Sequence, residues 1–141
     1  MITSMIRPFS VVAVTAMVCL GSVRAEDDTK MATEMKVVSK QLKALRTIPK
    51  DDYAAGAEAV RKAHEALLAA MQYIPVMVEE MPDGEEKAKA IADSRRVMGL
   101  SYASLCALEL AYLEKDPAKI EAAMSKVKEV KKEGHKKYTD D

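Results

Sequence analysis

The chain has 141 residues with 22 basic and 22 acidic side chains, so its formal net charge is zero. This balance gives no reason to expect nucleic acid or an anionic membrane as a partner. Strand-forming residues are sparse, with no tryptophan and a single phenylalanine, and helix-favouring residues dominate. The composition therefore predicts an all-α protein.

Residues 1–25 are typical of a cleavable signal peptide. Arg7 precedes an apolar run over residues 11–18, and Ala25 ends a small-residue site just before an acidic stretch. The apolar run is too short to span a bilayer. We expect export to the periplasm, cleavage after Ala25, and a mature domain over residues 26–141 that is not anchored to the membrane.

The mature part would hold 116 residues, which is enough for one domain but not for two. It would carry 20 basic and 22 acidic side chains, a net charge near −2. Cys106 is its single cysteine, so an internal disulfide is excluded and the thiol is expected to be buried in an apolar helix. We expect a monomer stabilised by packing, with or without a ligand.

The first two expected helices lie before residue 75. One runs over about residues 28–46, with apolar side chains at three- and four-residue steps: Met31, Met35, Val38, Leu42 and Leu45. The next begins at a cap of Asp51 or Asp52 and is bent or ended by Pro75. Its apolar stripe comprises Ala57, Val60, His64, Leu67 and Met71.

The last two expected helices follow clear breaks. One begins after Asp83-Gly84, and the other begins with Asp116 as its cap and Pro117 at the first helical position. The stripe of the third is Ala88, Ile91, Val97, Leu100, Leu105, Leu108 and Tyr112. That of the fourth is Ile120, Met124, Val127 and Tyr138.

Four helices of similar length with short connections predict an antiparallel up-down-up-down four-helix bundle. The common nucleotide-binding, hydrolase and calcium-binding motifs are absent from the sequence, and we do not expect an enzyme.

Candidate ligands for a bound group come from the two histidines and the methionines. His135 lies about 20° from Met124 on the helical wheel, close to the apolar stripe. Gly134 beside it would leave room for something bulky. In an up-down-up-down bundle Met35 and His135 lie toward the same end, about 8 Å apart in height. A thioether and an imidazole across one cavity can hold haem iron, although a methionine on such a stripe is commonly core filling.

Other ligand choices stay open at this stage. His64 would lie about level with Met35 on an apolar stripe, and Met31 precedes Met35 by one turn. A di-iron centre is disfavoured because neither histidine follows a glutamate by three residues. Covalent haem attachment is excluded because C-x-x-C-H is absent.

Two segments resemble the cytochrome b562 family of periplasmic haem proteins. Residues 35–45, MKVVSKQLKAL, are similar to the family's first helix and begin at its methionine ligand. Residues 107–123 and 134–138 resemble the family's third-to-fourth helix region, which ends in a His-x-Lys-Tyr signature. The chain departs from the family at Lys131, where an arginine is usual near the ligand histidine.

The resemblance implies a soluble electron-transfer protein that binds one non-covalent haem b (iron protoporphyrin IX). Met35 and His135 would be its axial ligands, and a redox protein would be its partner. A haem-free helical scaffold or interaction module, and a carrier of haem or metal, are the alternative functions.

Overall fold

A computed structural model describes residues 29–139, and it is all-helical over that range. The expected signal peptide and its cleavage site lie outside the described residues. The five helices in the described range are α1 (Lys30–Ala44), α2 (Tyr53–Ala70), α3 (Val76–Glu79), α4 (Glu85–Leu113) and α5 (Pro117–Tyr138). The all-α prediction is confirmed for this part of the chain.

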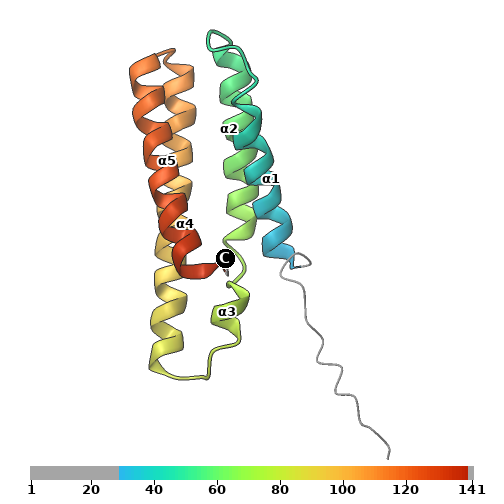
Figure 1. The fold of residues 1–141 in the computed structure, drawn as a ribbon, viewed down its shortest axis with the longest axis vertical. Helices are drawn as coiled ribbons and strands as arrows, with labels where there is room; N and C mark the ends of the chain where they lie inside the picture. Colours follow the sequence, from blue (N-terminus) through green and yellow to red (C-terminus); the bar gives the residue numbers. More distant parts are fainter. Residues whose placement is uncertain (1–28, 140–141) are drawn as a thin grey trace, which may run out of the picture.

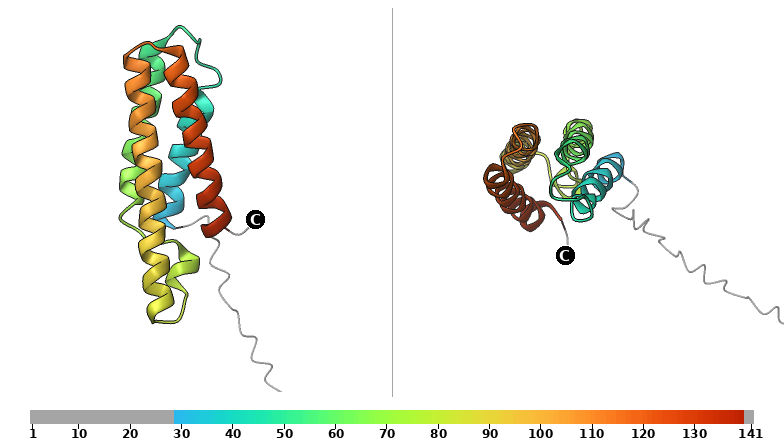
Figure 2. Two further views of the ribbon diagram at one scale, coloured as in Figure 1. Left: turned by 90° about the vertical axis from the view of Figure 1, so that its left-hand side faces the viewer. Right: turned by 90° about the horizontal axis from the view of Figure 1, so that it is seen from above.

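The four long helices pack side by side, and each runs opposite to the one before it (Figure 1). Seen from above, they occupy four corners in the order α1, α2, α4, α5 (Figure 2). Close packing joins α1 to α2, α2 to α4, and α4 to α5, while the short α3 lies against α4. Helices α1 and α5 are not closely packed against each other in this way.

The helix starts follow the capping residues of the sequence. Asp52 accepts a hydrogen bond from the backbone N–H of Ala55 at 3.0 Å and caps α2. Asp116 accepts from two backbone N–H groups at the start of α5, where Pro117 is the first helical residue. The predicted caps at Asp52 and Asp116 are thus confirmed, since each satisfies N–H groups that lack an intrahelical partner.

The connection between α2 and α4 differs from the sequence prediction. Helix α2 ends at Ala70, before Pro75, and Pro75 instead caps the unpredicted α3 by accepting from the N–H groups of Val78 and Glu79. Proline lacks an N–H and has a fixed φ, so it suits the start of a helix better than its interior. The prediction that Pro75 bends or ends the second helix is therefore wrong.

The core lies mainly where α2 faces α4. Its largest fully buried side chains are Val60, Leu67, Leu105 and Leu108. Complete burial stabilises each by about 1.5–3 kcal/mol relative to exposure. Five buried alanines of α2 leave room for its neighbours to pack closely: Ala57, Ala59, Ala63, Ala66 and Ala70.

Three positions of α4 depart from the predicted burial. Leu100 is 40% exposed, Ala88 is exposed and Cys106 is half-buried. Ala88 lies in the first turn of α4, and Figure 1 shows this end projecting past α1, α2 and α5 with only α3 beside it. The apolar periodicity of the sequence predicts burial equally for every turn of a helix. A side chain is buried only where a neighbouring helix lies at the same level.

Candidate functional site

A cavity of about 450 Å³, which we call the main cavity, lies between α1 and α5 and is backed by α2 and α4. Its lining includes Leu67 of α2, Val97 and Leu105 of α4, and Val127 of α5, all of which are buried core residues. This volume lies within the range of about 300–1,000 Å³ that is usual for small-molecule sites. The cavity therefore combines an apolar back wall with an opening at the α1/α5 seam.

Met35 and His135 both line this cavity, one from α1 and the other from α5. Met35 is half-buried and His135 is exposed. The start of α1 and the end of α5 lie at the same end of the molecule because the helices alternate in direction (Figure 1). Within residues 29–139, no hydrogen bond or ion pair engages the His135 ring, so its nitrogens are available to a ligand.

Met31 and Met98 also line the cavity, so three thioethers from α1 and α4 reach it. The structure brings Met31 to the same cavity as Met35, and both remain candidate partners for His135. Thioether sulfur is polarizable and soft, which suits contact with a flat aromatic group or with iron.

The polar groups of the back wall are already occupied. Ser94 donates to the carbonyl of Ile91 at 2.8 Å, and Ser101 donates to the carbonyl of Val97 at 3.0 Å. Each hydroxyl thereby bonds within its own helix rather than presenting a free donor. The back wall is therefore effectively apolar, and charge is confined to the mouth.

No aspartate or glutamate lines this cavity, whereas Lys36 and Lys131 do. A smaller cavity of about 250 Å³ shares Ser39, Leu42, Val127 and Lys131 with it. The smaller cavity adds Lys43, Arg46 and Lys128, again with no acidic side chain in its lining. An occupant of this seam would be favoured if it combined apolar surface with negative charge.

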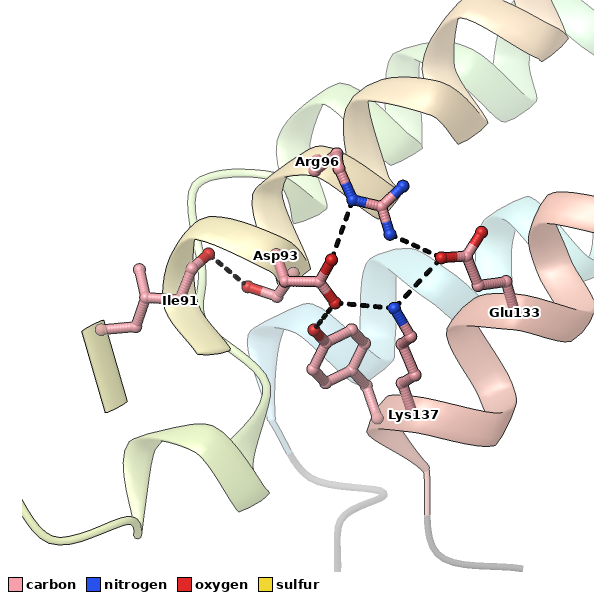
Figure 3. A network of polar contacts seen from close by, with 7 residues as sticks. Ile91, Asp93, Arg96, Glu133 and Lys137 are labelled. Carbon is pink, nitrogen blue, oxygen red and sulfur yellow. Dashed lines mark hydrogen bonds and ion pairs between the residues drawn. The ribbon is translucent and has the colours of Figure 1, made fainter. Parts of the chain in front are cut away.

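A polar network fixes the end of α5 that carries His135. Asp93 of α4 accepts from Arg96 at 2.8 Å, from Lys137 at 3.0 Å and from the hydroxyl of Tyr138 (Figure 3). Glu133 accepts from Arg96 at 2.5 Å and from Lys137 at 3.2 Å. These contacts hold the end of α5 against α4, and Tyr138 itself lines the cavity together with His135.

The network also shifts the acidity of its members. Hydrogen bonds from Tyr138, Lys137 and Arg96 hold the pKa of Asp93 far below its ordinary value. Burial, followed by the hydrogen bond to Asp93, raises the pKa of Tyr138 to about 12. Both shifts keep Asp93 charged and Tyr138 neutral over the whole physiological range.

His64, the alternative ligand, does not line the cavity. Its Nε2 lies 2.6 Å from Oε2 of Glu109 on α4, and its ring meets Tyr102 edge to face at 5.6 Å between centroids. Arg61 donates to the other oxygen of Glu109 at 2.9 Å. Burial raises the pKa of Glu109, but the hydrogen bonds from His64 and Arg61 outweigh this and leave it lowered.

The Nδ1 atom of His64 is buried and has no hydrogen-bond partner among residues 29–139. The predicted apolar stripe did place Val60 and Leu67 in the core, whereas His64 on the same helix makes a polar contact with Glu109 of α4. Sequence spacing gives the approximate face of a helix, but the contact with Glu109 sets the direction of this side chain.

Gly134 lines the cavity but does not leave the predicted gap. A Cβ added there would lie 3.2 Å from Cγ1 of Val97, which is itself buried. The space beside Gly134 is therefore filled by α4, and the glycine allows α4 and α5 to approach closely. The predicted gap is therefore absent on the Cβ side of Gly134, although Gly134 and His135 both line the cavity.

Several residues around the two cavities were not predicted from the sequence. Lys43 of α1, Arg46 just after α1 and Lys128 of α5 come together only after folding. The link between Asp93 and Lys137 spans 44 residues of sequence, and no local signal indicates it. The excess of lysine in α5 was visible in the sequence and could have indicated a charged edge.

Across residues 29–139, no group of three or more His, Cys, Asp or Glu side chains is placed to hold a metal ion. Among the described helices, none combines the length and apolar character needed to cross a bilayer. No protein-family model, curated protein or solved structure matches this chain.

Proposed function

We propose that this protein is an exported electron carrier that holds one non-covalent haem b between α1 and α5, with Met35 and His135 as axial ligands. We further infer that its four long helices constitute an up-down-up-down four-helix bundle. One observation carries the proposal: a single cavity is lined by Met35 from α1 and His135 from α5, although 100 residues separate them in sequence.

The residues present fit a haem in three respects. A thioether and an imidazole face one cavity from different helices, which is a donor pair known for haem iron. The apolar back wall suits the porphyrin faces. The lysines at the mouth, with no carboxylate among the lining residues, suit a group that carries two carboxylates.

Each part of the chain has a distinct role in this proposal. Met35 and His135 donate sulfur and nitrogen, and buried Leu67 and Leu105 exclude water from the back of the cavity. Lys131 lies where it can neutralise a carboxylate at the mouth. When bound, the haem supplies one-electron transfer through its iron, and two protein ligands leave no open position for substrate.

The similarity of residues 35–45 and 134–138 to the cytochrome b562 family adds support at the same two positions. The absence of C-x-x-C-H from the sequence favours non-covalent binding. The functional class therefore rests on two independent arguments, the shared cavity and the local sequence resemblance.

Titration of the purified mature protein with haem, followed by absorption spectroscopy, tests this proposal. We expect one equivalent to bind and to give a six-coordinate low-spin spectrum on reduction. Met35→Ala should give a high-spin reduced spectrum, weaker binding and a lower potential, because the thioether favours ferrous iron. His135→Ala should weaken binding more, since imidazole is the stronger ligand.

Met31→Ala and His64→Ala serve as matched controls. Each removes the same type of side chain, and each should retain the low-spin spectrum. If Met35→Ala retains the low-spin bands and Met31→Ala loses them, the sulfur ligand is Met31, one helical turn earlier, and the assignment of Met35 is wrong. Failure of the wild-type protein to bind haem would favour the haem-free scaffold, and pigment that resists acidified organic solvent would contradict non-covalent attachment.

A further inference from the structure

The two helices beside the cavity carry most of the excess positive charge of the chain. Helix α1 contains four lysines and one glutamate, and α5 contains seven lysines and three glutamates. The remainder of the chain has 11 basic and 18 acidic side chains, so the zero net charge conceals a strong separation. Such a separation creates a directional electrostatic field around the molecule.

Three of these lysines, together with Arg46, line the α1/α5 seam from both sides. Lys43 and Arg46 on or just after α1, and Lys128 and Lys131 on α5, all line the smaller cavity, and we call these four the cationic rim. No ion pair engages any of the four within residues 29–139. By contrast, Lys126 and Lys137 of α5 are paired with carboxylates. The rim therefore presents uncompensated positive charge.

The rim adjoins the mouth of the main cavity. The two cavities share four lining residues, and two of these, Ser39 and Lys131, lie one helical turn from Met35 and His135. Opposed like charges repel across the seam and make an anionic surface the complementary partner.

An acidic protein fits this surface better than an anionic membrane does. Basic membrane-binding faces carry apolar or aromatic side chains that enter the interface. The seven large hydrophobic side chains that are exposed in the described region line neither cavity: Val37, Leu68, Tyr73, Met77, Leu100, Leu110 and Leu113. The rim thus offers charge and a concave floor without a membrane-inserting element.

We propose that the cationic rim is the docking surface for an acidic protein, which binds over the mouth of the main cavity. The redox role of this docking rests on the proposed function, whereas the charge recognition itself does not require haem. The partner would be recognised by clustered Asp and Glu side chains, and its association would be accelerated by electrostatic steering.

Calorimetric titration with poly-L-glutamate, on the haem-free and haem-treated full mature protein, tests the docking surface. The double variant Lys43→Glu with Lys128→Glu should weaken binding about tenfold or more at low salt. Lys62→Glu with Lys126→Glu changes the net charge equally but alters lysines that are paired with Glu58 and Glu129 on other faces. This control variant should weaken binding less than the rim variant does. The effects of both double variants on binding should vanish near 1 M salt, where the Debye length is about 3 Å.

Equal weakening in the two double variants would overturn the proposal, because it would show that net charge alone determines binding. Rim-dependent binding to phosphatidylglycerol vesicles that exceeds binding to poly-L-glutamate would also overturn it, in favour of a membrane. Failure of the proposed function gives a different result. If the wild-type protein binds poly-L-glutamate through the rim but does not bind haem, the docking surface is supported and the proposed haem carrier is contradicted.

Discussion

Gly56 and Gly99 both lie inside helices, yet a methyl group added at each would meet different surroundings. At Gly56 of α2, an added Cβ would lie 2.3 Å from Cε1 of Tyr112, so the ring packs directly on the glycine backbone. At Gly99 of α4, nothing lies within 4 Å of the added atom. Helix propensity favours alanine at both positions by about 1 kcal/mol, so packing decides the outcome.

We expect Gly56→Ala to destabilise the protein by about 1–3 kcal/mol, because the half-buried ring of Tyr112 must move. Gly99→Ala should instead stabilise it by up to about 1 kcal/mol. Urea unfolding of the two variants measures the opposite signs. Stabilisation by both substitutions would mean that the contact between Tyr112 and Gly56 is not maintained in solution.

At the scale of the element, the last turns of α5 depend on charge pairing with α4 more than on apolar burial. Val130 is the last buried residue of the helix, and beyond it the contacts with Asp93 and Arg96 hold the segment. The position of His135 therefore depends on the ionisation of Asp93 on α4 and of Glu133 on α5.

The pKa of Asp93 is lowered on folding, so its pairing stabilises the protein above the unfolded pKa of about 3.9 and is lost as the pH falls below it. We expect Asp93→Asn to lower the melting temperature at neutral pH, and the difference from wild type to shrink below about pH 4. Asp83→Asn, at an exposed carboxylate bound to Lys87, is the control and should change little. A difference that persists unchanged in acid would contradict this role of Asp93.

The folded pKa of Tyr138 is raised to about 12, above its unfolded value of about 10. Its contribution to stability is therefore complete below about pH 10 and is lost as the pH rises toward the folded value. We expect Tyr138→Phe to remove the decline of wild-type stability in that alkaline range, as followed by circular dichroism. An identical decline in both proteins would assign it to other groups.

At the level of the whole molecule, α2 and α4 each have two close long-helix neighbours, whereas α5 packs closely on α4 alone and α1 packs closely on α2 alone. Of these two outer helices, α1 has fewer buried residues. Val38 is its single buried residue, and several of its apolar side chains are half-buried at the cavity. A ligand between α1 and α5 would supply the contacts that this seam lacks.

We expect haem to raise the melting temperature by mass action and to slow hydrogen exchange most strongly in α1. The physical reason is that the ligand joins α1 to α5, while the α2/α4 core is already packed. Hydrogen exchange with mass spectrometry measures the pattern, with haem-treated His135→Ala as the control. Protection confined to α2 and α4 would place the ligand elsewhere.

Local signals in the sequence predict the four long helices and the starts of α2 and α5. Asp52, Asp116 and Pro117 act on backbone groups within a few residues, so their effect is legible without any tertiary information. The alternation of helix direction then brought the candidates Met35 and His135 toward one end, and both line the same cavity in the structure.

Other features depend on the rotation of each helix and on contacts between residues distant in sequence, and these are set only by the tertiary structure. It turned His64 toward Glu109, filled the space beside Gly134 with Val97, and linked Asp93 to the end of α5. It also gathered the cationic rim from two helices of a chain with no net charge. Capping and periodicity are local, whereas cavities, ion pairs and electrostatic fields exist only once separate helices have been placed side by side.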